Sequence, residues 1–227
     1  MENIIFENKD YIVYNKPSGM LVQSDKSFDV DLVSLLMTYL VQKGEKASIF
    51  VINRLDRPVS GLVLLAKNKE TASKLSIELT AGRIGKRYEA VVCGELPERK
   101  GTFTDYLLKD GKSNTSRVVP DKIKEAKKAV LAYEVVETKQ AENEGMGILS
   151  LVRIHLVTGR HHQIRVQFAS RGYALFGDMK YNHNSAVSEC RVPLALCSCE
   201  LSFWDKTFII EPEGGAFEYF RKHSGTL

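Results

Sequence analysis

Short apolar runs recur along this chain, and they limit the folds that it can adopt. A run such as residues 62–66 has the length of a strand, whereas a helix that crosses a membrane needs roughly 18 or more apolar residues. Runs of this kind, rich in β-branched and aromatic residues, predict strands at 4–6, 11–14, 50–52, 61–66, 87–92, 101–108, 129–136, 148–157 and 192–203. The polar segment 109–128 should form an exposed, basic hairpin or loop.

Three other segments carry helix signals. Asp31 can cap a helix whose apolar residues form one stripe over 32–40, and Asn68 can cap a second helix that ends near Gly82. A third helix is expected near residues 161–170. Because helices and strands are interspersed without a regular βαβ rhythm, we predict an α+β fold with a central mixed or mainly antiparallel sheet flanked by helices.

Composition narrows the class of protein. Apolar residues make up 44% of the chain and charged residues 26%, which excludes a disordered tail. A length of 227 residues suits one large domain or two small ones. The segment 1–7 has no signal-peptide features, and the four cysteines are too few for a disulfide scaffold, so we expect a cytoplasmic protein with free thiols. The spacing of Cys190, Cys197 and Cys199 fits no zinc pattern.

The net charge of +4 is unevenly distributed. Residues 83–128 and 150–191 are both basic, and the acidic segment 129–149 separates them. If the fold brings the two basic segments together, they form a positive surface that suits a polyanion such as nucleic acid. Solvated surface side chains explain the charge equally well, so charge alone leaves both interpretations open.

The first pattern that could support chemistry surrounds Asp56. This residue lies in a loop between two apolar runs, with Arg54 and Arg57 beside it. Positive neighbours favour the ionised carboxylate, which can act as a nucleophile or a general base. Aspartate is also common in turns for structural reasons, and this alternative remains open.

The second pattern is the segment 158–165, in which a Thr-Gly turn starts a helix rich in arginine and histidine. Helix N-termini and arginine side chains both attract phosphate or carboxylate groups. Because His161 and His162 are adjacent, they should not face the same way on a helix, which argues against a metal pair. A solvated helix start is the structural alternative.

The third pattern places Tyr88 at the start of a strand, next to Lys86 and Arg87. An aromatic ring among basic residues can stack on a nucleobase while the cations hold phosphates. An aromatic residue at this position is also typical of a hydrophobic core.

Taken in order, these segments resemble the RluA-type family of RNA pseudouridine synthases. Residues 54–62 resemble the catalytic loop of that family, residues 86–92 its aromatic motif and residues 158–165 its arginine motif. Further matching segments are 11–22, 172–181 with Gly177-Asp178 inside, and 196–203. The resemblance covers essentially the whole chain.

The resemblance implies the pseudouridine synthase fold with an active-site cleft, in a single catalytic domain over residues 1–227. It implies a short form without the N-terminal RNA-binding domain of many members. The expected activity is isomerisation of specific uridines in tRNA, rRNA or both to pseudouridine, with no cofactor, no metal, RNA as the partner and a monomeric state.

The resemblance also implies roles for individual residues. Asp56 would be the catalytic carboxylate, as nucleophile at C1′ or base at C2′, Arg165 would pair with it, and Tyr88 would stack on the uracil. The implied RNA-binding residues are Arg54, Arg57, Arg160, His162, Gln163, Lys86, Arg87 and Leu196.

Two departures from the family motivate a different hypothesis. Asn53 stands where the family usually has His, and Val59 where it usually has Thr. These changes are compatible with a catalytically weak RNA-binding or ribosome-assembly factor on the same fold. A glycoside hydrolase would need a second carboxylate. Asp178 is the only candidate inside a motif, and Gly177-Asp178 fits a structural turn better.

Overall fold

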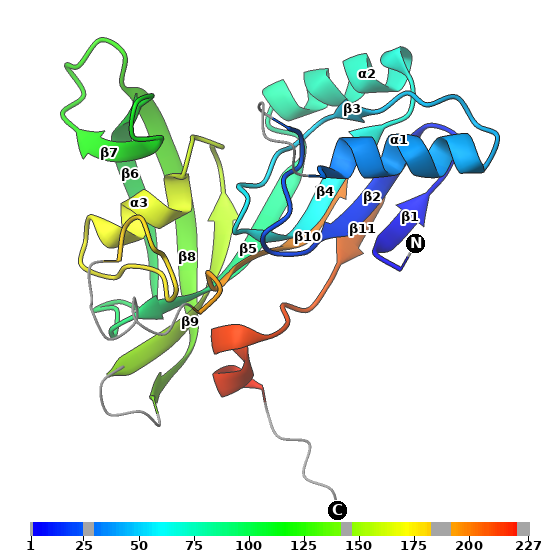
Figure 1. Ribbon diagram of the computed structural model, residues 1–227. Coiled ribbons are helices and arrows are strands. Elements are labelled where there is room, and N and C mark those ends of the chain that lie inside the picture. The colour runs from blue at the N-terminus through cyan, green and yellow to red at the C-terminus, as the bar shows by residue number, and fades with distance from the viewer. Residues whose placement is uncertain (1, 25–29, 142–146, 183–191, 222–227) are drawn as a thin grey trace, which may run out of the picture. The chain divides into compact units, whose positions relative to one another are not determined.

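The computed structural model describes residues 2–24, 30–141, 147–182 and 192–221, and Figure 1 shows its elements. The chain divides into two compact units. The first unit holds residues 1–86 and 197–211, and the second holds residues 87–196 and 212–227. In the described part of the chain, no helix is long and apolar enough to cross a membrane.

The first unit combines two helices of the described chain with a mixed sheet. Its elements are β1 (Ile4–Glu7), β2 (Tyr11–Lys16), α1 (Leu32–Gln42), β3 (Phe50–Val51), β4 (Ser60–Ala66), α2 (Lys69–Thr80), β10 (Leu196–Phe203, from its second residue) and β11 (Lys206–Ile209). The strands lie in the order β1-β2-β4-β10, with β3 also paired to β4 and β11 to β10. Strand β10 runs parallel to β4, and the other pairings are antiparallel.

Local sequence signals set the ends of both helices of this unit. The Asp31 carboxylate accepts a hydrogen bond from Ser34 N at 2.9 Å, and Asn68 Oδ1 accepts one from Thr71 N at 2.9 Å. Both N-caps are as the sequence predicts. Helix α2 buries Leu75 in a core shared with β2, β4 and β10.

Strands β4 and β10 approach closely at Gly61. This residue has a φ of +112°, and a Cβ atom there would overlap the backbone of Ser198. Only glycine fits such a position, because it has no Cβ and adopts positive φ without strain. The Ser60-Gly61 pair of the catalytic-loop motif therefore permits the parallel pairing that follows the Asp56 loop.

The second unit is built on an antiparallel sheet. Its elements are β5 (Gly85–Cys93, from its third residue), β6 (Lys100–Asp110), β7 (Thr115–Val119), β8 (Lys127–Gln140), β9 (Ile148–Leu156), α3 (Gln163–Ala169) and the 3₁₀ helix η2 (Gly215–Phe220). The strand order is β5-β9-β8-β6-β7, and each neighbouring pair is antiparallel. Phe168 of α3 packs against Phe103 of β6 and Tyr133 of β8, with ring centroids 5.0 and 5.8 Å away.

The predicted α+β class and the mixed, mainly antiparallel strands are confirmed. The polar segment 109–128, expected as a hairpin or loop, includes the turn and the second strand, β7, of a hairpin whose first strand is β6. The strand expected from residue 192 begins only at Leu196, and β11 and η2 were not predicted.

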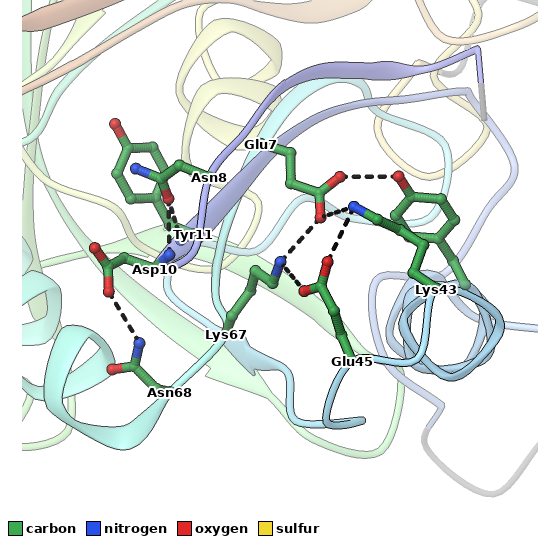
Figure 2. A network of polar contacts seen from close by, with 9 residues as sticks. Glu7, Asn8, Asp10, Tyr11, Lys43, Glu45, Lys67 and Asn68 are labelled. Atoms are coloured by element: carbon green, nitrogen blue, oxygen red, sulfur yellow. Dashed lines mark hydrogen bonds and ion pairs between the residues drawn. The ribbon is translucent and has the colours of Figure 1, made fainter.

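A network of ion pairs links the ends of several elements in the first unit (Figure 2). Glu7, at the end of β1, accepts hydrogen bonds from Lys43 and Lys67, each at 2.9 Å, and from the Tyr39 hydroxyl at 2.9 Å. Glu45 pairs with the same two lysines. The network therefore joins β1 to the chain that leaves α1 and to the chain that leaves β4.

Replacing Glu7 by Gln tests the strength of this network. Burial alone would raise the pKa of Glu7, but hydrogen bonds from Lys67, Lys43 and Tyr39 outweigh it and lower the pKa to about 2 from 4.5. Because the folded pKa is depressed, ionised Glu7 stabilises the fold above pH 4.5, and this contribution is lost as the pH falls toward 2. We expect Glu7→Gln to lower the free energy of unfolding at pH 7 by about 1–2 kcal/mol.

Urea unfolding of both proteins between pH 7 and pH 3 measures the effect, and the deficit should shrink below pH 4.5. The matched control is Glu70→Gln, because Glu70 pairs with Lys74 through side chains that are 79% and 62% exposed. A deficit in Glu7→Gln that does not change with pH would contradict the assignment.

Candidate active site

Asp56 lies in the loop between β3 and β4 of the first unit, where a neighbouring turn holds the loop in place. Val59 N donates to the Asp56 carbonyl at 3.0 Å. Gly19 N donates to the Arg57 carbonyl at 2.8 Å, and Arg57 Nε donates to the Gly19 carbonyl at 3.0 Å. Ser18 Oγ also donates to the Pro58 carbonyl at 2.8 Å. The carboxylate is thus carried on a loop whose following residues, 57 and 58, are bonded to the turn at residues 18 and 19.

Lys16 provides a buried positive charge in the same loop region. The residue is 0% exposed, and its ammonium donates to the carbonyls of Pro17, Met20 and Arg57 at 2.9, 2.9 and 3.2 Å. Burial lowers the pKa of Lys16 to about 8, while the negative charge of Asp56 acts in the opposite direction. Lys16 was not among the predicted site residues, although it lies inside the matching segment 11–22.

The two departures from the family pattern that motivate the RNA-binding hypothesis, Asn53 and Val59, are both buried. The Asn53 side chain donates to the Leu62 carbonyl at 3.3 Å and accepts from Leu64 N at 2.7 Å, so it braces strand β4. Val59 is 3% exposed. Both residues therefore lie buried within the loop that carries Asp56, one on each side of it.

Arg165 lies on α3 of the second unit and forms a buried ion pair. Its Nε and Nη2 atoms donate to the two carboxylate oxygens of Asp178, each at 2.7 Å. The two side chains are only 4% and 0% exposed. Asp178 was expected in a structural turn, and the hydrogen bonds that its carboxylate accepts from Lys180 N and Tyr181 N show that turn. The bidentate pairing with Arg165 was not predicted.

The expectation that His161 and His162 face different ways is wrong. Their rings stack with centroids 3.8 Å apart, because His162 has a φ of +53° and precedes the helix, which begins only at Gln163. His161 Nδ1 lies 2.9 Å from Ser116 Oγ, and His162 Nδ1 lies 2.8 Å from the Tyr181 hydroxyl. Burial, reinforced by the charge of Arg165, lowers the pKa of His162 to about 3, so this imidazole is neutral at pH 7.

Gln163 and Arg160 stabilise the turn before α3. The buried Gln163 side chain accepts from Thr158 Oγ1 at 2.8 Å and from Arg160 N at 2.9 Å, and it donates to the Val130 carbonyl at 3.1 Å. Arg160 Nε donates to the Lys128 carbonyl at 2.9 Å, and its side chain is exposed. The arginine motif is therefore tied to strand β8.

Tyr88 is a buried residue of β5 and lies opposite Ile154 of β9. Arg87 is exposed and Lys86 is half-buried, and burial lowers the pKa of Lys86. Leu196 is buried at the start of β10.

Asp56 belongs to the first unit, whereas Tyr88 and Arg165 belong to the second. Arg54 and Arg57 are both exposed on the loop that carries Asp56. Within the described residues, no group of three or more His, Cys, Asp or Glu side chains could hold a metal ion, and Cys190 lies outside those residues.

The chain resembles known proteins over most of its length. The family described as RNA pseudouridylate synthase matches residues 10–170. A Bacillus subtilis protein named uncharacterized RNA pseudouridine synthase YhcT is 31% identical over 82% of this chain and 59% of its own length. A Blochmanniella floridana protein named ribosomal large subunit pseudouridine synthase D is 32% identical over 83% of this chain and 56% of its own length. The chain thus spans less than two thirds of these relatives.

Solved structures share the fold. Human RNA pseudouridylate synthase domain containing 1 covers 93% of this chain and 83% of its own length, with a TM-score of 0.76 and 21% identity. Human RNA pseudouridylate synthase domain containing 4 covers 92% of this chain and 88% of its own length, with a TM-score of 0.75 and 20% identity. At this level of identity, the likeness establishes the fold.

Replacing Lys16 by Met tests the buried ammonium. The pKa of Lys16 is about 8 in the folded protein and 10.5 in its ordinary state. Between pH 8 and pH 10.5 the unfolded chain therefore binds more protons at Lys16 than the folded protein does. Folding becomes more favourable as the pH rises through this range, because folding releases a proton from Lys16 and a higher pH favours that release. The free energy of unfolding of wild type relative to Lys16→Met should therefore rise between pH 8 and 10.5, by up to about 3 kcal/mol at 1.36 kcal/mol per pKa unit.

Urea unfolding of both proteins at pH 7, 8, 9 and 10 measures this difference. The matched control is Lys74→Met on the exposed face of α2, whose difference from wild type should not rise over this range. If the difference in free energy of unfolding between the wild type and Lys16→Met did not change with pH, the depressed pKa of the buried lysine would be contradicted.

Proposed function

The chain belongs to the RNA pseudouridylate synthase family, and on this premise we propose that it isomerises specific uridines in structured RNA to pseudouridine. The family match carries the proposal, since residues 10–170 include Asp56, Tyr88 and Arg165. These residues lie respectively on a braced loop, in a sheet and on a short helix.

The reaction breaks the N1–C1′ bond of uridine, turns the base and forms a C5–C1′ bond. The hydrogen at C5 then leaves as a proton, and N1, which has lost its bond to C1′, takes up a proton. Because the product is an isomer of the substrate, no electrons are gained or lost and no co-reactant is consumed. The proposal therefore includes no cofactor.

We assign Asp56 as the carboxylate that acts at the sugar, either as nucleophile at C1′ or as base at C2′. The bonds that hold its loop, together with the nearby Lys16 charge, support this role, because a reacting group must be held in place. The two routes differ in whether the C2′–H bond breaks. Deuterium at C2′ therefore slows the reaction only if Asp56 acts as the base at C2′.

In this proposal, Tyr88 stacks on the uracil and Arg165 pairs with Asp56. All three residues must act on the same uridine, so the proposal treats residues 1–227 as a single catalytic domain. The target nucleotide must leave its stack to react, which costs a few kcal/mol in a duplex and less in a loop.

RNA is the proposed partner, in the cytoplasm and with a monomeric enzyme. The exposed cations Arg54, Arg57, Arg87 and Arg160 suit phosphate contacts, and the remaining proposed contacts are Lys86, His162, Gln163 and Leu196. Binding through phosphate contacts should weaken as salt is raised. Some relatives are named for the large ribosomal subunit, so rRNA is the first substrate to test and tRNA the second.

The structural roles of Asn53 and Val59 weaken the case for an RNA-binding factor without activity, because both side chains stabilise the fold beside Asp56. The bidentate pairing of Asp178 with Arg165 weakens the case for a glycoside hydrolase. Both carboxylate oxygens of Asp178 already accept hydrogen bonds from the guanidinium, whereas a general acid must donate one.

Asp56→Asn tests the assignment of the carboxylate. We expect it to lower the rate by on the order of 10²–10⁴-fold or more and to leave RNA binding unchanged, because the amide can neither attack C1′ nor take a proton. The assay is tritium release from [5-³H]uridine-labelled total RNA of cells that lack the gene, with filter binding of the same RNA.

The matched control is Asp121→Asn in an exposed turn, which should behave as wild type. Full activity in Asp56→Asn would overturn the assignment. A wild type that binds RNA and releases no tritium would instead favour the RNA-binding factor. Mapping pseudouridines in cells with and without the gene then identifies the target.

Tyr88→Phe tests the tyrosine hydroxyl. The ring and its stacking surface remain, so we expect the fold and RNA affinity to be retained while turnover falls by about 10²-fold or more through loss of a proton-transfer group. Single-turnover tritium release and a thermal melt measure the two effects. Tyr106→Phe on β6 is the matched control, and wild-type kinetics for Tyr88→Phe would remove the hydroxyl from the mechanism.

A further inference from the structure

We propose that Asp178 is a positioning residue for the isomerisation, which fixes the orientation of the Arg165 guanidinium. This inference rests on the proposed function, in which Arg165 is catalytic. Asp178 was expected only to form a turn, yet it makes two direct bonds to Arg165 in a buried setting.

The pairing determines which edge of the guanidinium is engaged. Asp178 binds Nε and Nη2, each at 2.7 Å, so any second acceptor must approach from the Nη1 side. The bidentate geometry fixes the plane of the guanidinium as well as its position. Arg165 thus has one edge committed to Asp178 and the other directed away from it.

The structure also fixes Asp178 itself. Its Oδ1 atom accepts hydrogen bonds from Lys180 N at 2.9 Å and Tyr181 N at 3.2 Å. The preceding Gly177 has a φ of +75°, and a Cβ atom there would overlap the carbonyl of Pro193. The carboxylate is therefore held by its own backbone turn, and it does not depend on Arg165 for its place.

Tyr181 supports the guanidinium from a second direction. The guanidinium carbon of Arg165 lies 5.2 Å from the centroid of the Tyr181 ring, a distance at which the cation and the ring attract each other. The Tyr181 hydroxyl accepts from Ser116 N of β7 at 2.7 Å and lies 2.8 Å from Nδ1 of the neutral His162, which can accept its proton. Strand β7 and the turn before α3 therefore both hold the ring.

The negative charge of Asp178 limits the electrostatic attraction that Arg165 can exert on a substrate. Asp178 offsets the positive charge of Arg165 at close range, so the pair carries little net charge. Arg165 consequently acts through the direction of its N–H groups more than through net attraction for an anion. A small displacement of the guanidinium should then be costly, as for other groups that must be held in a productive geometry.

A double-mutant cycle tests the inference. We expect Asp178→Asn to lower the single-turnover rate of tritium release from the same labelled RNA by on the order of 100-fold. The enzyme is kept in saturating excess, so the rate constant does not depend on the folded fraction. In the Arg165→Gln background, the same change should alter the rate by less than about 2-fold, because Asp178 then has no guanidinium to position.

The matched control is Asp105→Asn. Asp105 also binds an arginine, Arg171 just after α3, at 2.9 and 3.1 Å, and it accepts from Gln167 Nε2 at 2.6 Å, so this change breaks a similar arginine pair that does not include Arg165. It should leave the rate at the wild-type value. If Asp178→Asn does not fold, Asp178→Glu keeps the charge compensation and displaces the guanidinium, and it should also lower the rate.

Two results would overturn the role of Asp178 while leaving the proposed function intact. One is a wild-type rate in Asp178→Asn or in a folded Asp178→Glu. The other is an equal loss in both Arg165 backgrounds, which would show that Asp178 acts on the fold. A wild-type enzyme that releases no tritium overturns the proposed function and, with it, the catalytic use of the pair.

Discussion

The loop that carries Asp56 depends on a lysine whose charge is buried in the protein. Moving an ammonium group out of water is costly unless its hydrogen bonds are replaced. The carbonyls of Pro17, Met20 and Arg57 replace them, and they come from both segments that must meet at the loop. Lys16 therefore orders two segments at once and places a positive charge near a carboxylate.

The second unit also orders the chain around a proposed site residue with a buried charged group, here an ion pair. Arg165 sits on the short helix α3 and Asp178 in a turn farther along the chain, and the two side chains are 4% and 0% exposed. A paired arginine keeps its geometry where a solvated one would not. In both units, a buried cation thus orders the chain around a residue that the proposed reaction requires.

Local features of the fold could be predicted from the sequence. The caps Asp31 and Asn68 act on residues three positions away, and the alternation in β9 buries Val152, Ile154 and Leu156 as a two-residue period requires. The left-handed backbone at His162 could not be predicted, because Tyr181, nineteen residues away, helps to hold it. The partnership of Arg165 with Asp178 was missed for the same reason. The ordered motifs located Asp56, Tyr88 and Arg165, but a motif names residues and does not give their contacts.

The order of synthesis has a consequence for the first unit. Its core includes Leu201 and Phe203, which belong to β10, together with residues of β2 and β4 near the start of the chain. Strand β4 therefore gains its parallel partner only after most of the chain has left the ribosome. Until then the apolar residues of β2 and β4 lack part of their cover, so the core of the first unit is completed only after residues 87–196 of the second unit have been synthesised.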